Sequence, residues 1–297
     1  MKESGVKFLA EACGGSIIGK VANTVKAVKI DSREIGPGEM FVAVIGENND
    51  GHDYLKEAYA RGSRVFLVSD KEKSLALLRS DASVSLILTS DTVAALRNMA
   101  SAYLNQFSLK RVAVTGSVGK TTTRALTAAV LAQKYRTVSA EKNLNTDLGT
   151  SITAFSADES TELIVFEMGM DRRHEIEGYC DWIKPSLAIV TNIGISHLEY
   201  LGTRDEIARE KLSITKYLAA DDYLIYQCDG DYLKDDAEMR SFALGSGFKS
   251  FRVGRGGDLS ASDVRDLGPE GISFSLRFGD EIQPCRLPLA GIHNADN

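Results

Sequence analysis

The chain of 297 residues lacks long hydrophobic runs and any excess of positive charge. No apolar stretch approaches the roughly 20 residues that span a bilayer, so we expect no membrane insertion. The opening Met-Lys-Glu-Ser-Gly also lacks the layout of a signal peptide. The 35 Lys and Arg against 41 Asp and Glu give a net charge of −6, which argues against a nucleic-acid partner. Small phosphorylated ligands are not excluded, because they need only local positive charge.

Cysteine is scarce and scattered. The four cysteines form no Cys-x-x-Cys pair and have no histidine at metal-ligand spacing: Cys13, Cys180, Cys228 and Cys285. This pattern favours buried, reduced thiols in a cytoplasmic protein over a disulfide framework or a zinc site. The chain is 43% hydrophobic and 26% charged, as is typical of a globular protein, and its length predicts two domains.

The first 89 residues mix short apolar runs with turns, and we expect them to form a small N-terminal α/β domain. The runs predict four strands and one short helix: 26–30, 40–45, 64–68, 84–88 and the helix 53–61, which Gly62 ends. A helical periodicity over 91–105 marks the approximate start of a second domain, residues 90–297.

The second domain alternates short strands with helices. The strands 111–115, 163–166 and 187–191 and the helices 122–134 and 204–218 predict a mostly parallel sheet that is covered on both faces. From residue 223 onward the pattern becomes β-rich. Alternating side chains over 271–278 predict a half-buried strand, and Gly279-Asp280 predicts the turn of a hairpin. We therefore expect an α/β fold with a β-rich end.

The strongest local motif is Val112-Ala-Val-Thr-Gly-Ser-Val-Gly-Lys-Thr-Thr-Thr123, a strand that enters a glycine-rich turn and then a helix. Gly116 and Gly119 allow backbone N–H groups to face a phosphate, and the helix N-terminus adds positive potential. Lys120 is placed to reach the terminal phosphates, and the Thr121 hydroxyl to bind Mg²⁺. The match is partial, since Val114 stands where the strict pattern has a glycine.

Two further polar residues lie at or after predicted strand ends, and a third lies on the helix that follows. Glu167 ends a buried strand, which suits a Mg²⁺ ligand as well as it suits a turn cap or a partner for arginine. His197 follows another strand end, beside the predicted nucleotide site, and this position favours a functional role over a structural one. Lys211 lies on the next predicted helix and by itself suggests only a solvated surface residue.

Three polar segments are uninformative by spacing. Asn143-Leu-Asn-Thr-Asp-Leu-Gly149 has the composition of a loop. In Asp31-Ser-Arg33 and Asp50-Gly-His-Asp53, Arg33 and His52 suit either a phosphate or nearby carboxylates. The residues alone thus predict an ATP-binding α/β domain that uses Mg²⁺, and they leave the acceptor open.

Together these motifs resemble the Mur ligases, cytoplasmic enzymes that add amino acids to the UDP-linked peptidoglycan precursor. The segment 115–122 resembles their ATP loop, which also lacks the early glycine, and 31–53 is similar to the N-terminal domain of the two late ligases. Features that favour the ligase adding D-alanyl-D-alanine are 143–149, Glu167-Met-Gly-Met170, and 192–199 followed by Gly202 and 208–211.

The resemblance implies a role for each motif residue. ATP would be held by Gly116, Ser117, Gly119, Lys120, Thr121 and Thr122, with Asn294 near the adenine. Thr121 and Glu167 would hold one Mg²⁺, and His197 with Glu167 would hold a second, supported by a carbamylated Lys211. Lys120, His197 and Lys211 would be the catalytic residues. The substrate would be bound by Ser32, Arg33, Asp50, Gly51, His52, Asn143 and Asn145.

The implied reaction joins D-Ala-D-Ala to UDP-N-acetylmuramoyl-tripeptide through an acyl phosphate, at the expense of ATP. Three residues depart from the family pattern: His174 stands for the usual glycine, and Thr146 and Ser151 replace Asn and Pro. The family carries a third domain that closes over ATP, and the sequence stops soon after Asn294, so we expect a fragment with weak or no ligase activity.

Three other functions compete with this interpretation. The closest is the ligase that adds the third residue of the peptide. Folylpolyglutamate or cyanophycin-type ligation is more distant, and Asp31-Ser-Arg33 argues against it. A protein that binds the UDP-sugar peptide without catalysis is the third, against which the intact Lys120, Glu167, His197 and Lys211 weigh.

Overall fold

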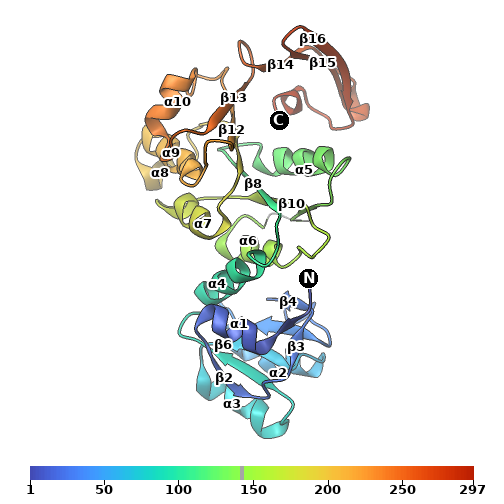
Figure 1. The fold of residues 1–297 in the computed structure, drawn as a ribbon, viewed down its shortest axis with the longest axis vertical. Coiled ribbons are helices and arrows are strands. Elements are labelled where there is room, and N and C mark those ends of the chain that lie inside the picture. Colours follow the sequence, from blue (N-terminus) through green and yellow to red (C-terminus); the bar gives the residue numbers. More distant parts are fainter. Residues whose placement is uncertain (141–143) are drawn as a thin grey trace. The chain divides into compact units, whose positions relative to one another are not determined.

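The structure, a computed structural model, describes residues 1–140 and 144–297, and it forms two compact units (Figure 1). The first unit holds Met1–Ser108 and Asp147–Thr161, and the second holds Leu109–Thr146 and Glu162–Asn297. The boundary expected after residue 89 lies inside the first unit, because helix α4 (Thr92–Leu104) packs against helix α1 (Val6–Cys13) of that unit.

The first unit contains a five-stranded sheet with the strand order β2-β7-β6-β5-β4. Its strands are β2 (Ser16–Gly19), β4 (Ala27–Lys29), β5 (Glu39–Val42), β6 (Val65–Val68) and β7 (Ser85–Leu88). Only β2 runs antiparallel to its neighbour. The short strands β1 (Ser4–Gly5) and β3 (Thr24–Val25) pair separately. The four strands predicted here are confirmed, and β1, β2 and β3 are additional.

Two helices of this unit, α3 and α4, begin at an aspartate that caps them. Asp70 accepts a hydrogen bond from Lys73 N at the start of α3 (Lys71–Ser80), and Asp91 accepts from Val93 N and Ala94 N at the start of α4. The predicted helix 53–61 is divided into the 3₁₀ turn η1 (Gly51–Tyr54) and α2 (Leu55–Ala60). The core of the unit is formed by apolar side chains of the helices and of the sheet, among them Phe41 of β5 and Phe66 of β6.

One segment of the first unit comes from the middle of the second unit's sequence. Helix α6 (Asp147–Ala154) packs on α4, and Arg97 Nη1 pairs with Asp147 Oδ2 at 3.0 Å. The fully buried Tyr103 donates its hydroxyl to Ala157 O at 2.6 Å. These contacts hold 147–161 within the first unit.

The second unit is built on a nine-stranded sheet with the order β16-β15-β14-β13-β12-β11-β8-β10-β9. The parallel strands are β8 (Lys110–Thr115), β9 (Thr137–Ser139), β10 (Leu163–Glu167), β11 (Leu187–Val190), β12 (Tyr223–Gln227), β13 (Lys249–Val253) and β14 (Leu259–Asp266). The strands β15 (Ile272–Phe278) and β16 (Glu281–Leu287) extend one edge of the sheet as an antiparallel hairpin. The predicted parallel sheet and the hairpin at Gly279-Asp280 are both confirmed.

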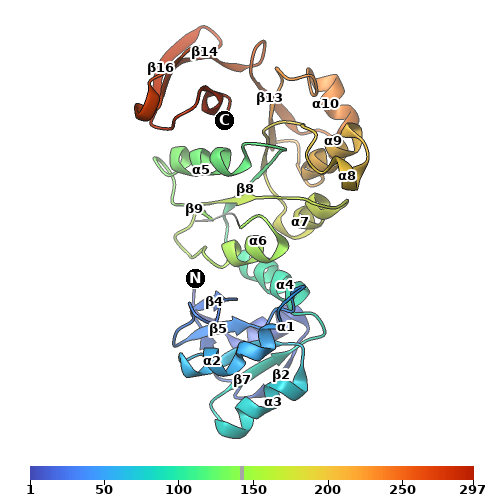
Figure 2. The same ribbon diagram turned by 180° about the vertical axis from the view of Figure 1, so that it is seen from behind.

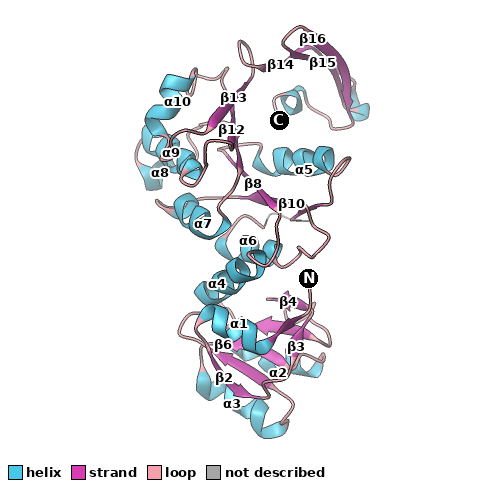
Figure 3. Ribbon diagram, in the orientation of Figure 1, coloured by secondary structure: helices cyan, strands magenta, loops and turns pink. Residues whose placement is uncertain are grey.

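Helices cover both faces of this sheet (Figures 1, 2 and 3). Helix α5 (Lys120–Leu131) lies on one face, over β8, β9 and β10. The opposite face carries α7 (Glu175–Ile183), α9 (Arg204–Leu212) and α10 (Asp236–Phe242), with the short α8 (Leu198–Leu201) preceding α9. The helix predicted over 204–218 ends at Leu212 and continues as the 3₁₀ turn η2 (Ser213–Thr215). Helix α10 lies within the region that was expected to be β-rich.

Two short 3₁₀ turns, η3 (Gly268–Glu270) and η4 (Ile292–Ala295), complete the second unit. Within the described residues, the helices are all too short or too polar to cross a membrane.

Candidate active site

The phosphate loop lies between β8 and α5, as the motif predicts. Gly119 adopts a left-handed conformation (φ 82°) and caps α5, so Lys120, Thr121 and Thr122 form the first helical turn. The N–H groups of a first turn have no intrahelical acceptor and suit an anionic ligand. Lys120 Nζ lies 2.8 Å from Gly116 O and 3.3 Å from Ser117 O, so the ammonium is held over the loop. Burial lowers the pKa of Lys120 from its ordinary value.

Glu167 ends β10 and is 1% exposed. Its Oε1 accepts hydrogen bonds from Thr121 Oγ1 at 3.0 Å and from Asn145 Nδ2 at 3.1 Å. Its Oε2 lies 3.4 Å from Arg124 Nε, an ion-pair distance, yet neither atom makes a hydrogen bond to any residue that the structure describes. A buried carboxylate with a threonine hydroxyl beside one of its oxygens suits a hard divalent cation, because such a cation prefers carboxylate and hydroxyl oxygens.

Lys211 is buried under the phosphate loop, at 1% exposure, and its Nζ donates to Gly116 O at 3.0 Å. Gly116 O therefore accepts from both Lys120 and Lys211. Burial, and then the nearby charge of Lys120, lower the pKa of Lys211 to about 7. The structure thus places Lys211 in the site rather than on the surface, where spacing alone would have left it.

His197 lies in the loop between β11 and α8 in a left-handed conformation (φ 65°). Its Nδ1 is 3.3 Å from Asp171 Oδ1, so the structure pairs it with Asp171. In the described ranges, no three His, Cys, Asp or Glu side chains gather at a spacing that would bind a metal. The structure brings Thr121 and Glu167 into hydrogen-bond contact and pairs His197 with Asp171.

Asn294 is buried in η4, where its side chain donates to Ala290 O at 2.8 Å and accepts from Asn297 Nδ2 at 3.1 Å. Asn297 in turn contacts the phosphate loop: its Oδ1 accepts from Thr123 Oγ1 at 3.3 Å, and a Cβ on Gly119 would lie 2.2 Å from that oxygen. The predicted residue Asn294 therefore reaches the nucleotide loop through Asn297.

The first unit holds a pocket of about 490 Å³, and three of the predicted substrate residues line it: Ser32, Arg33 and Gly51. Ser32 Oγ donates to Glu57 Oε2 at 2.8 Å. The exposed Arg33 side chain forms a two-pronged ion pair with Asp31, and its hydrogen bonds hold the pKa of Asp31 at about 2. Gly51 is required by close packing, because a Cβ there would lie 2.5 Å from Val44 N.

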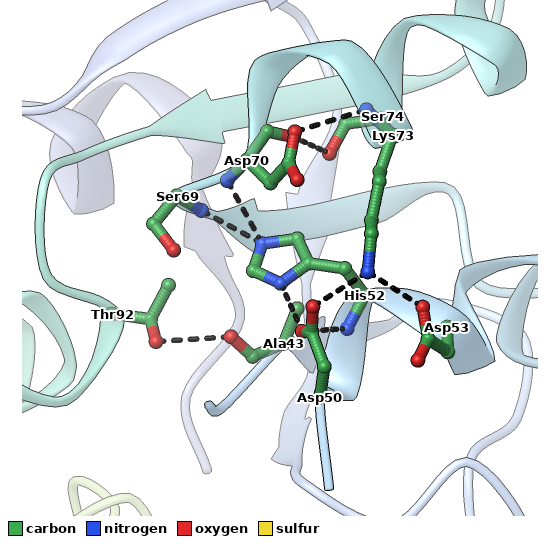
Figure 4. A network of polar contacts seen from close by, with 9 residues as sticks. All are labelled: Ala43, Asp50, His52, Asp53, Ser69, Asp70, Lys73, Ser74 and Thr92. Atoms are coloured by element: carbon green, nitrogen blue, oxygen red, sulfur yellow. Dashed lines mark hydrogen bonds and ion pairs between the residues drawn. The ribbon is translucent and has the colours of Figure 1, made fainter. Parts of the chain in front are cut away.

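His52 is buried, and both of its ring nitrogens are engaged (Figure 4). Nε2 accepts hydrogen bonds from Ser69 N and Asp70 N, each at 3.0 Å. Nδ1 lies 2.6 Å from Asp50 Oδ1 and, since Nε2 accepts, must carry the proton. Lys73 completes the network with an ion pair to Asp50, which is the largest cause of that carboxyl's lowered pKa. The His52 ring therefore has no hydrogen-bonding atom left for a ligand.

The remaining predicted residues differ in what the structure says of them. Asn143 lies outside the described residues. Asn145 bonds Glu167, and its carbonyl accepts from Gly169 N at 2.8 Å. His174 has φ 67°, a conformation that glycine adopts without strain, which explains why glycine suits this position. Ser151 donates to Asp147 O at 2.7 Å.

Three residues near the site were not assigned from the sequence. Arg124 lies one helical turn after Lys120 and donates to Ser139 Oγ at 2.8 Å and to Ala140 O. Its i+4 spacing from Lys120 was an available signal. Asn297 follows Asn294 by three residues. Asn192 was noted only as part of a motif, and its hydrogen bonds to the phosphate loop depend on tertiary structure.

Comparison with known proteins assigns the family. Residues 114–297 match the Mur ligase middle domain, and residues 24–104 match the Mur ligase family catalytic domain. The UDP-N-acetylmuramoyl-tripeptide–D-alanyl-D-alanine ligase of Bacillus subtilis is 32% identical over 294 residues, which cover 98% of this chain and 61% of that protein.

Solved structures agree. MurF from Acinetobacter baumannii matches with a TM-score of 0.85 at 28% identity, covering 100% of this chain and 63% of that one. MurF from Thermotoga maritima in complex with ADP matches with a TM-score of 0.73 at 26% identity, covering 91% and 61%. The chain thus spans about 60% of the length of these relatives. With most of its length matched by the middle-domain pattern, the chain belongs to the Mur ligase family.

Proposed function

We propose that this protein takes part in the ATP-dependent joining of D-alanyl-D-alanine to UDP-N-acetylmuramoyl-tripeptide, a step of peptidoglycan precursor synthesis in the cytoplasm. The observation that carries the proposal is the buried Glu167 beside Thr121 at the mouth of a phosphate loop. The choice of substrates is supported by the B. subtilis relative, a UDP-N-acetylmuramoyl-tripeptide–D-alanyl-D-alanine ligase, and by the similar MurF structure from A. baumannii. The four free cysteines agree with a reducing compartment.

In this proposal the second unit binds Mg·ATP. Lys120 and the N–H groups of the first turn of α5 hold the phosphates, and Asn297 and Asn294 border the nucleotide. Thr121 and Glu167 would hold Mg²⁺, because the buried Glu167 carboxylate lies beside the Thr121 hydroxyl and its Oε2, which faces Arg124, has no hydrogen bond to a described residue. The bound ion would neutralise the charge of the phosphates. His197 would join these ligands only if it left Asp171.

The chemistry needs two displacements. A carboxylate oxygen of the tripeptide forms a bond to the γ-phosphorus of ATP, and the bond to ADP breaks. The amine of D-Ala-D-Ala then forms a bond to the acyl carbon, and phosphate leaves as the amine loses its proton. Lys120 stabilises negative charge on the transferred phosphoryl group in both displacements. Phosphorylation is required because a carboxylate is by itself a poor acyl donor.

Lys211 would act in its carbamylated form. Its lowered pKa leaves much of the amine neutral near pH 7, and only the neutral amine adds carbon dioxide. The product carbamate is an anion, and Lys120, whose charge disfavours a second ammonium, would stabilise it. Carbon-13 NMR of the folded chain at neutral pH in labelled bicarbonate buffer would detect the carbamate carbon, and its signal should be absent from Lys211→Met.

The first unit would bind the UDP-linked substrate. Ser32, Arg33 and Gly51 line its pocket and stay candidates, and Arg33 would exchange its bond to Asp31 for a phosphate. For Asp50 and His52 the hydrogen bonds support a structural role instead, since they hold the turn that carries Gly51.

The test measures phosphate release from Mg·ATP by the 297-residue chain, together with calorimetric binding of ADP and of UDP-N-acetylmuramoyl-tripeptide. We expect both ligands to bind, and we expect any phosphate release to require the tripeptide and D-Ala-D-Ala together. Release that requires a free amino acid in place of the dipeptide would support the ligase for the third residue. ADP binding without any binding of the UDP-linked tripeptide would contradict the proposal.

A further inference from the structure

The turn of the phosphate loop, Ser117 and Val118, is bonded to the segment that follows β11. Ser117 N donates to Asn192 O at 3.1 Å, and Gly194 N donates to Ser117 Oγ at 2.8 Å. Thr191 Oγ1 donates to Val118 O at 2.5 Å. Gly116 is so close to Thr191 that a Cβ would lie 1.8 Å from its hydroxyl oxygen. The loop and the segment 191–194 therefore form one interlocked structure.

The Asn192 side chain makes the most specific of these contacts. Its Oδ1 accepts from Val118 N at 3.1 Å, and its Nδ2 donates to Val118 O at 3.1 Å. A carboxamide is the side chain group that presents an acceptor and a donor side by side, so it pairs with one residue's N–H and C=O as a neighbouring strand would. An aspartate at position 192 would have the same shape but no donor, so one of its oxygens would face the Val118 carbonyl oxygen and repel it.

The segment 191–194 is also held from its other side. Arg204, the first residue of α9, donates from Nε to Ile193 O at 3.0 Å. Helix α9 carries Lys211, whose ammonium bonds Gly116 O. Three residues beyond the segment lies His197. The segment thus connects the phosphate loop, the His197 loop and the helix of Lys211.

We propose that Asn192 is a positioning residue for nucleotide binding: with Thr191 it clamps the Val118 peptide and keeps the phosphate loop in its nucleotide-accepting shape. The inference rests on the proposed nucleotide site. A loop with glycine at 116 and 119 and an exposed Val118 side chain has much conformational freedom to lose on binding. Because the clamp orders the loop before the nucleotide binds, less conformational entropy is lost on binding.

The clamp divides the N–H groups of the phosphate loop into those that bond the protein and those that are free to bind phosphate. Ser117 N and Val118 N are bonded to Asn192 and face the protein. The N–H groups of Lys120, Thr121 and Thr122 belong to the first turn of α5 and are left for phosphate oxygens. Asn192 therefore need not touch the nucleotide to control its affinity.

The test compares Asn192→Asp and Asn192→Ala with the matched control Asn98→Asp, which makes the same chemical change at an exposed position of α4. Calorimetry measures ADP binding with Mg²⁺, and amide hydrogen exchange measures protection of Val118 N–H without nucleotide. We expect about tenfold weaker ADP binding for Asn192→Asp. We also expect faster exchange at Val118 in both Asn192 variants and no change in Asn98→Asp.

A second pair of variants tests the hydroxyl and keeps the proposal falsifiable where an Asn192 variant folds poorly. Thr191→Val should weaken ADP binding about threefold, and Thr191→Ser should retain the wild-type affinity because it keeps the hydroxyl. ADP affinity within twofold of wild type in folded Asn192→Asp would overturn the clamp alone. A wild-type chain that does not bind ADP would overturn both the clamp and the proposed function.

Discussion

The two predicted ligand sites use their motif residues in opposite ways. In the phosphate loop of the second unit, Lys120 and Thr121 lie on a helix whose first-turn N–H groups have no intrahelical acceptor, and one oxygen of Glu167 makes no hydrogen bond within the described part of the chain. In the first unit, His52 and Asp50 satisfy each other and their neighbours. A motif residue can therefore mark a site either by binding the ligand or by holding the backbone that binds it.

The largest expected effect is a loss of stability when His52 of the first unit is replaced, and it tests the structural half of this contrast. His52→Ala removes a buried ring and three hydrogen bonds, and it leaves Ser69 N and Asp70 N unpaired. We expect a loss of about 3 kcal/mol in the free energy of unfolding. Urea denaturation measures the loss, and the exposed His293→Ala serves as control. A loss equal to the control's would show that the His52 network contributes nothing to the fold.

The opposite result is expected in the second unit. Lys120→Met removes the ammonium that lies over the phosphate loop and should weaken ADP binding about a hundredfold, since charged hydrogen bonds to phosphate are lost. Stability should change little, because burying that ammonium is itself costly. Calorimetry with the exposed Lys134→Met as control measures the difference. If Lys120→Met instead unfolded the chain and Lys134→Met did not, Lys120 would be a structural residue like His52.

These two sites also show what could be predicted from sequence. The alternation of strands and helices, the phosphate loop and the strand end at Glu167 follow from local patterns, and all are confirmed. The return of 147–161 to the first unit depends on Tyr103 and Arg97, which lie far away in sequence. The same is true of the bonds between Asn192 and Val118. Local periodicity contains no information about such contacts.

The pH dependence of the free energy of unfolding tests whether the Lys211 ammonium is shielded from water. The pKa of Lys211 is about 7 in the folded chain and near its ordinary 10.5 when unfolded. Between these values the unfolded chain binds more protons, so stability should rise with pH above 7. We expect the rise from pH 7 to pH 9 to be about 2 kcal/mol larger in wild type than in Lys211→Met, in buffer free of carbon dioxide. Parallel slopes for the two proteins would place the ammonium in contact with water.

The smallest expected effect concerns a residue that belongs to neither ligand-binding role. His174 holds a left-handed conformation before α7, and its backbone N–H donates to the buried Glu210 at 2.7 Å. Glycine relieves roughly 1–2 kcal/mol of strain there and loses about 0.5–1 kcal/mol through its greater freedom when unfolded. His174→Gly should therefore raise stability by about 0.5 kcal/mol, measured by urea denaturation.

His174→Ala separates the strain from the side chain's own contact. It keeps the left-handed backbone and removes the exposed ion pair between His174 and Glu177, which contributes little at the surface. We expect its stability to stay close to that of wild type. If the alanine and glycine variants were both less stable than wild type by the same amount, the contacts of the His174 side chain would contribute more to stability than its left-handed backbone costs. Histidine in place of glycine would then stabilise the chain.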